Sequence, residues 1–151
     1  MTGFYELTTK IKDALIADPF INQVTKGDID RLVTAKQNMY PLAHILVNNV
    51  TFENNVQRAN ISIIAMDLVD ISKEETTDIF LGNDNEDDVL HTMLAALNRL
   101  YESLRRGAMH DDNYTIDGTA NNEPFYDRFE DIVAGWTMTF DILIANDMTI
   151  C

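Results

Sequence analysis

The chain has few of the residues on which common catalytic sites depend. It contains one cysteine, Cys151, and six glycines in 151 residues. A lone cysteine excludes an intramolecular disulfide framework and is typical of proteins of a reducing cytosol. The glycines are too scattered for a loop that cradles phosphates, and no G-x-S-x-G elbow is present. The sequence therefore offers no standard nucleophile or nucleotide site.

Positive charge is also scarce. Lys and Arg number 11 against 25 Asp and Glu, which gives a formal net charge of −14. This balance disfavours a nucleic-acid-binding protein that contacts phosphates over a broad surface. It remains compatible with a surface past which DNA slides without sticking.

The first residues lack a long apolar run, because Glu6, Lys10, Lys12 and Asp13 interrupt it. We therefore expect neither a signal peptide nor a membrane-spanning helix. Hydrophobic residues make up 46% of the chain and charged residues 24%, a globular composition. This length and composition predict a single domain over residues 1–151.

Two helices are predicted from apolar residues at helical spacing. The first runs from Gly3 to Ala17 and ends at Asp18-Pro19, because the residue before proline is pushed out of the helical region. The second is long and ends before Gly107, with acidic residues in its first turn and arginines in its last. We expect its leucine stripe to be buried against a sheet; the stripe includes Leu90, Leu94, Leu97 and Leu104.

The clearest strand is AGWTMTFDILI, Ala134 to Ile144, in which apolar and mostly polar residues alternate strictly. A hairpin is predicted from Pro41 to Asp70, with strands Pro41 to Glu53 and Gln57 to Asp70 joined by a turn at Asn54-Asn55.

The remaining segments give weaker signals. We expect a short strand over Phe20 to Val24 with a turn at 25–28, and either a strand or a helical turn over Ile29 to Lys36. Ser72 to Asp88 is predicted as an exposed loop, and Ala108 to Glu123 as a polar loop with a turn at 117–118. The order of elements predicts an α+β fold, in which an antiparallel sheet is packed by one long amphipathic helix and an N-terminal helix.

Candidate metal ligands have simpler explanations. The cluster Asp84, Glu86, Asp87 and Asp88 lacks the order of an EF-hand loop and suits a helix start instead. His91 and the run His110, Asp111 and Asp112 are fragments of a metal-dependent phosphohydrolase pattern, but a second histidine-aspartate pair on a helix is missing. We therefore expect no metal and no cofactor.

The polar side of the last strand and the residues after it are the candidate interface. Thr137, Thr139 and Asp141 alternate with the apolar side, and Met148 and Ile150 give the acidic chain an apolar end. This end is either an ordinary strand edge or a C-terminal arm, residues 146–151, that lies on a neighbouring subunit.

The run YDRFEDIVAGWTMTFDILIANDMTIC, Tyr126 to Cys151, resembles the closing segment of small head and tail proteins of tailed bacteriophages, especially crAss-like and other phages of Bacteroidetes. The hairpin over 41–70 is similar too, and the order of elements resembles that of tail-terminator and neck proteins.

The resemblance implies a structural virion protein with a tail-terminator-like fold, made in the host cytoplasm and placed in the neck or tail. Such proteins form rings of roughly six or twelve copies, contact the portal, an adjacent neck ring or tail proteins, and let DNA pass. No enzymatic activity is implied. Two alternatives stay open: a small cytosolic metal-dependent hydrolase using His91, His110, Asp111 and Asp112, and an acidic adaptor that binds a basic partner.

Overall fold

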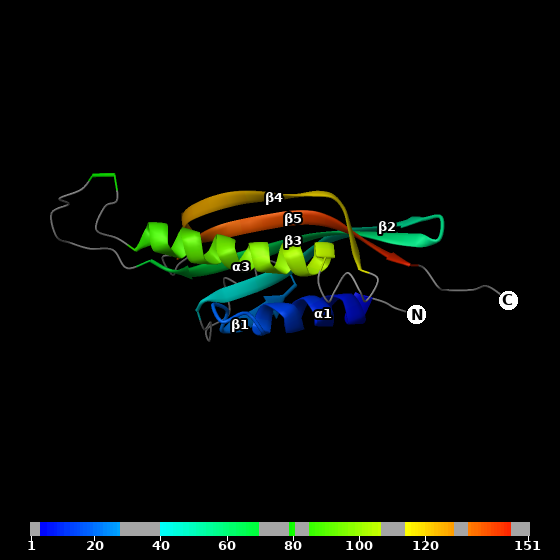
Figure 1. The fold of residues 1–151 in the computed structure, drawn as a ribbon, viewed down its shortest axis with the longest axis horizontal. Coiled ribbons are helices and arrows are strands. Elements are labelled where there is room, and N and C mark those ends of the chain that lie inside the picture. The colour runs from blue at the N-terminus through cyan, green and yellow to red at the C-terminus, as the bar shows by residue number, and fades with distance from the viewer. Residues whose placement is uncertain are drawn as a thin grey trace.

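The computed structural model describes residues 4–27, 40–69, 79–80, 85–106, 114–128 and 133–145. Two helices and five strands lie in these ranges (Figure 1). In chain order they are α1 (Phe4–Ile16), β1 (Gln23–Lys26), β2 (Leu42–Glu53), β3 (Val56–Leu68), α3 (Glu86–Arg106), β4 (Thr115–Arg128) and β5 (Val133–Ala145). The fold is α+β, as the sequence predicts. None of the described helices combines the length and the apolar character needed to cross a membrane.

The five strands form one sheet in the order β1-β2-β3-β5-β4. β1 pairs with β2 in parallel, and the other neighbours are antiparallel. The sheet is therefore mixed, and the predicted antiparallel arrangement is confirmed for all the described strand pairs except β1–β2. The chain between Lys26 and Leu42 is long enough for the crossover that a parallel pair requires. The predicted Ile29 to Lys36 element lies outside the described residues.

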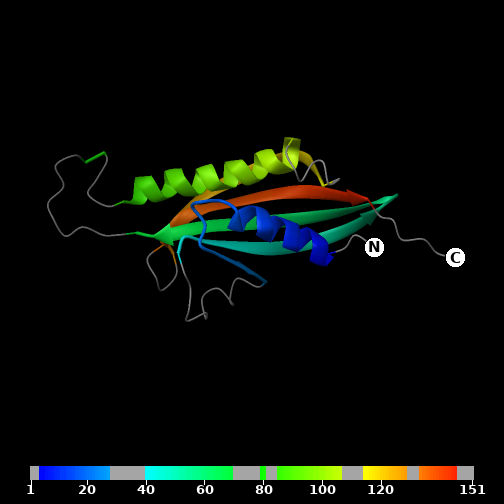
Figure 2. The same cartoon turned by 60° about the horizontal axis from the view of Figure 1, so that its bottom comes forward.

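Both helices pack on one face of the sheet (Figure 2). Leu7, Ile11 and Leu15 of α1 share one core cluster with the buried residues of α3 and with alternate residues of β2, β3 and β5. The other side of the sheet, here called the outer face, carries neither of the two described helices. A smaller apolar cluster lies there, formed by Leu42, Ile64, Met66, Phe125 and Val133.

Helix α3 confirms the predicted long helix, with one correction to its buried stripe. Leu97 and Leu104 are fully buried and Leu90 is partly buried against the core. Leu94 is 37% exposed, so the expectation that it is buried is wrong. The buried stripe of α3 keeps Leu97 and Leu104 but lies slightly to one side of the predicted one; it consists of Val89, Met93, Ala96, Leu97, Leu100 and Leu104. Leu94 lies to one side of this stripe.

The hairpin of β2 and β3 confirms the prediction from sequence. Asn55, in the turn, has a positive φ of 64°, a conformation that asparagine tolerates better than most residues. Ile61 to Met66 are all buried, because β3 is the middle strand and this part of it is covered on both faces. Apart from Ser62, this stretch is apolar, which is the pattern expected of a strand buried on both faces.

The polar segment after α3 is a strand rather than the predicted loop. Residues Thr115–Arg128 form β4 at the edge of the sheet, and the predicted turn at Asp117-Gly118 lies within this strand. Gly118 has a φ of 78°, and the pairing with β5 shifts register between Asp117 and Asn121. An edge strand exposes much of its length to water, so its residues can be polar. It then lacks the alternation of apolar residues by which a strand is predicted from sequence.

Smaller differences concern the first strand and the acidic loop. β1 begins at Gln23, later than the predicted Phe20, and includes Thr25 and Lys26, which we assigned to a turn. Most of the predicted loop Ser72 to Asp88 lies outside the described residues, and its last three residues open α3. β5 confirms the predicted strand within one residue at each end.

Candidate functional site

The alternation in β5 gives the outer face its polar side chains. Ala134, Met138, Phe140 and Ile142 are buried beneath the helices. Thr137, Thr139 and Asp141 therefore lie on the outer face, where each is half-buried. The half-exposed Trp136 points its indole Nε1 to the carbonyl of Leu90 on α3, at 2.8 Å. The sequence correctly divided this strand into its two sides.

A ladder of short polar side chains crosses three strands of the outer face. Ser62 Oγ lies 2.9 Å from Thr139 Oγ1, and Asn60 donates from Nδ2 to Asp141 Oδ1 at 2.8 Å. Asn48 of β2 donates from Nδ2 to both Asn60 Oδ1, at 2.8 Å, and Ser62 Oγ, at 2.9 Å. These five residues therefore hydrogen-bond to one another without an external ligand.

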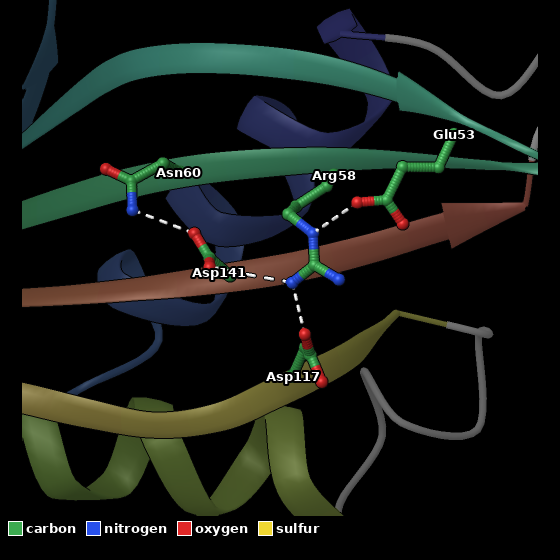
Figure 3. Close-up of polar contacts among 5 residues, drawn as sticks. All are labelled: Glu53, Arg58, Asn60, Asp117 and Asp141. Carbon is green, nitrogen blue, oxygen red and sulfur yellow. Dashed lines mark hydrogen bonds and ion pairs between the residues drawn. The ribbon is translucent and has the colours of Figure 1, made fainter.

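Arg58 lies at the end of this ladder, among three carboxylates (Figure 3). Its Nε donates to Glu53 Oε1 at 2.8 Å, and its Nη1 donates to Asp117 Oδ2. The same Nη1 lies 3.6 Å from Asp141 Oδ2. Because the four residues come from β2, β3, β4 and β5, the guanidinium connects four strands. We call this group the Arg58 cluster.

The Arg58 cluster is negatively charged as a whole, since three carboxylates surround one guanidinium. The hydrogen bonds to Glu53 and Asp117 outweigh desolvation and raise the pKa of Arg58 above its ordinary value. The side chain therefore stays cationic, and its donors are directed at carboxylates of its own chain. Such an arginine gives the outer face little cationic hold on phosphate.

His44 is a buried polar residue that our reading of the sequence did not single out. It is fully buried within β2, with Nδ1 2.7 Å from Thr25 Oγ1 and Nε2 2.9 Å from the carbonyl oxygen of Gly27. A carbonyl only accepts, so Nε2 carries the proton of that bond. The contacts tie β1 to β2. The signal for a structural histidine is its place in the apolar run PLAHILV.

The structure describes only some of the candidate metal ligands, and those form no metal site. Glu86, Asp87 and Asp88 open α3, and His91 is exposed one turn later. Asp84, His110, Asp111 and Asp112 lie outside the described residues, as do Met148 and Ile150 of the predicted interface. Within the described ranges, no three His, Cys, Asp or Glu side chains are close enough to hold a metal ion.

A groove of about 590 Å³ runs between α3 and β4 on the helix side of the sheet. Its floor is apolar and consists of Leu94, Ala95, Tyr101, Ala120 and Met138. Polar, uncharged groups border it, contributed by His91, Asn98, Thr119 and Asn122. Among the residues that the structure describes, no Asp, Glu, Lys or Arg lines this groove.

Comparison with the models of known protein families gives no match, and comparison with curated proteins gives none either. The function is therefore argued from the residues, the geometry and the resemblance of the closing segment.

Proposed function

We propose that this protein is a structural subunit of a tailed-phage virion, forming a homo-oligomeric ring in the neck or tail-completion region through which DNA passes. The proposal starts from the resemblance of the segment Tyr126 to Cys151 to small head and tail proteins of tailed phages, and we extend it to a tail-terminator-like fold. The order of helix, strands, helix and strands supports that extension.

The outer face of the sheet is the observation that carries the proposal. Its hydroxyls, amides and carboxylates bond to one another, and its one clustered cation is held by Glu53, Asp117 and Asp141. A passage lined by such groups repels phosphate weakly. That repulsion is screened beyond about 8 Å at cellular salt, so DNA would move along the surface without binding.

In this proposal Thr137, Thr139 and Asp141 lie at a subunit boundary or along the passage. The residues after Ala145, with Met148 and Ile150, form an arm on the next subunit. The portal, an adjacent neck ring or tail proteins are the partners, and no catalytic residue is involved.

Mass photometry and electron microscopy of the purified chain test the ring. We expect closed particles with the mass of roughly six or twelve chains. Antibody labelling of purified virions should then place the protein at the head-to-tail junction. A chain that stays monomeric at high concentration and is missing from virions would contradict the proposal.

A pair of charge reversals tests the role of the outer face. Glu123 pairs in register with Thr137, so it lies on the outer face, whereas Asp13 is exposed on α1. Glu123→Lys and Asp13→Lys change the net charge equally. If the outer face lines the passage, rings of Glu123→Lys should retain duplex DNA about tenfold or more tightly, since each subunit adds a phosphate contact. Equal DNA binding by the two variants would exclude that placement.

A further inference from the structure

One dipeptide of β4 has a chemistry that neither the fold nor the proposed function uses. Asp117 and Gly118 form the only Asp-Gly pair in the chain, and the sequence contains no Asn-Gly pair. In an Asp-Gly pair the amide nitrogen of the glycine can attack the side-chain carboxyl carbon of the aspartate, because glycine has no side chain to hinder the approach. Asp117-Gly118 is therefore the aspartate position of this chain at which such a rearrangement meets the least steric resistance.

The backbone around Gly118 departs from regular sheet geometry. The pairing of β4 with β5 shifts register between Asp117 and Asn121, and Gly118 has a φ of 78°. No heavy atom of the described residues, apart from those of its chain neighbours, lies within 4 Å of the place where a Cβ of Gly118 would be. The Asp117 side chain is 45% exposed, so water reaches its carboxyl group. An irregular edge strand leaves room for the two groups to rearrange.

Arg58 holds the Asp117 carboxyl group in one position. Arg58 Nη1 donates to Asp117 Oδ2, while Arg58 Nε donates to Glu53 Oε1 at 2.8 Å. Figure 3 shows the Asp117 carboxyl group directed from β4 toward the guanidinium on β3. Because Glu53 fixes the guanidinium from the other side, Arg58 can restrain the carboxyl group of Asp117 rather than follow it.

This restraint opposes the attack by the Gly118 nitrogen. The carboxyl carbon must turn toward that nitrogen before a bond can form, and the turn breaks the charge-assisted hydrogen bond from Arg58. A hydrogen bond to a charged group is stronger than a bond between neutral groups, so its loss adds to the barrier of the rearrangement.

We propose that Asp117-Gly118 is a site of isoaspartate formation, and that the hydrogen bond from Arg58 protects this site in the folded chain. The carboxyl group of Asp117 reacts in its neutral acid form. The Gly118 nitrogen bonds to Cγ, and the hydroxyl of the acid leaves with the amide proton as water. A second water molecule opens the resulting succinimide at either carbonyl carbon, which gives aspartate again or isoaspartate. The reaction takes place within one chain and needs no reactant other than water.

The product would change the edge of the sheet. In isoaspartate the main chain runs through the side-chain carbons, so it is longer by one carbon atom, and the free carboxylate is attached directly to Cα. The pairing of Asp117 with Asp141 and the contact with Arg58 both depend on the normal linkage. Isoaspartate at this position would therefore release the first part of β4 from its neighbours.

Peptide mapping with fragmentation that distinguishes isoaspartate from aspartate tests the protective role of Arg58. Arg58→Met removes the guanidinium, and Leu97→Ala is the control, because it weakens the core but keeps the contacts of Arg58. The chains are incubated at neutral pH and at a temperature where circular dichroism shows them folded. We expect isoaspartate at position 117 to form about fivefold faster or more in Arg58→Met than in the unchanged chain or in Leu97→Ala.

Equal rates in Arg58→Met and the unchanged chain would overturn the inference. Equal acceleration in Leu97→Ala would do so as well, because exposure through unfolding would then set the rate. If Arg58→Met does not stay folded, Arg58→Gln keeps a polar side chain on the outer face, and the same acceleration is expected from it.

A second substitution tests the chemical route. In the Arg58→Met background, Gly118→Ala places a methyl group beside the attacking nitrogen, so we expect the rate at position 117 to fall back to that of the unchanged chain or below it. Asp13, an exposed aspartate followed by alanine on α1, is the internal reference and should not change in any variant. An unchanged rate after Gly118→Ala, or an equal rise at Asp13, would overturn the inference.

Discussion

Asp18 is the residue that joins the two helices. Its side chain is only 5% exposed and accepts two bonds from Arg99 of α3, from Nε at 2.5 Å and from Nη2 at 2.9 Å. It also accepts a bond from the backbone N–H of Phe20 at 2.9 Å. Burial by itself would raise the pKa of Asp18, but the bonds from Arg99 and Phe20 outweigh it and lower the pKa. Asp18 therefore connects the segment just after α1 to α3.

The lowered pKa of Asp18 predicts a pH-dependent contribution to stability. A carboxyl with a lower pKa in the folded state stabilises the fold above its unfolded pKa of about 3.9. That contribution is lost as the pH falls through the folded value. We expect Asp18→Asn to lower the free energy of unfolding by about 1–2 kcal/mol at pH 7, since Arg99 is partly exposed. Urea denaturation from pH 7 to 2 should show the difference shrinking below pH 4; a constant difference would contradict the prediction.

Gly135 allows β5 to approach β3 closely. A Cβ built at this residue would lie 1.9 Å from the backbone oxygen of Ala65 and 2.9 Å from Met66 Cα. Because these are backbone atoms of the central strand, they cannot move aside without disturbing the sheet. The sequence placed Gly135 on the polar side of the strand but gave no sign of this contact.

We predict that Gly135→Ala destabilises the protein by about 3 kcal/mol or more, because the added methyl group meets backbone. Gly118→Ala is the matched control. It has open space around it but a φ of 78°, so it should cost about 1 kcal/mol from backbone strain alone. Thermal or urea denaturation of both variants compares the two effects. Equal losses would mean that the close approach of β5 to β3 does not constrain Gly135.

At the scale of elements, α3 shows that tertiary packing determines which of its apolar residues are buried. Leu94 and Leu97 both belong to the predicted stripe, yet Leu97 is fully buried and Leu94 borders the groove. The spacing identified the helix and its general apolar side. The boundary of the buried face depends on the positions of β4 and β5. The sequence of the helix carries no information about those positions.

This difference predicts unequal effects of two identical truncations. Leu97→Ala should lower the free energy of unfolding by about 2–5 kcal/mol, as cavity-forming core substitutions do. Leu94→Ala should lower it by less than about 1 kcal/mol, because much of that side chain already contacts water in the single chain. Chemical denaturation at a concentration where the chain is monomeric measures both. Similar losses would contradict the observed packing of α3.

The edge strands are the elements that hydrophobic patterns predict least well. Both faces of β3 are covered along Ile61 to Met66, and β5 has one buried face, so their patterns are clear. β4 pairs on one side only and is interrupted by a register shift after Asp117. β1 has four residues, too few for periodicity. β4 was missed and β1 was placed three residues early at its start because neither strand has the burial that produces a clear pattern.

At the scale of the whole molecule, the structure separates two kinds of surface. The outer face carries the polar ladder and the Arg58 cluster beside the smaller apolar cluster, whereas the helix side carries the main core and the groove between α3 and β4. Assembly through the helix side would leave the outer face free for passage or for boundary contacts. This division is consistent with the proposed ring.

The C-terminal arm belongs to this scale as well. We predict that a chain lacking residues 146–151 remains folded, because β5 is paired with β3 through Ala145 and its buried residues precede the deletion. Ring formation or incorporation into virions should weaken, since Met148 and Ile150 would no longer cover a neighbour. Circular dichroism and mass photometry test the two parts. Unfolding of the shortened chain would place the arm in the core, and normal incorporation would exclude the arm.

The sequence by itself determined the helices, the hairpin and the two sides of β5, because each depends on periodic burial along one segment. It also determined the charge and the scarcity of catalytic residue types. Only the tertiary structure decided the parallel pairing of β1, the strand β4, the contact at Gly135 and the meeting of Arg58 with Glu53, Asp117 and Asp141. These features join residues from segments far apart in the chain. Their energies depend on register and on neighbouring strands, so no local pattern records them.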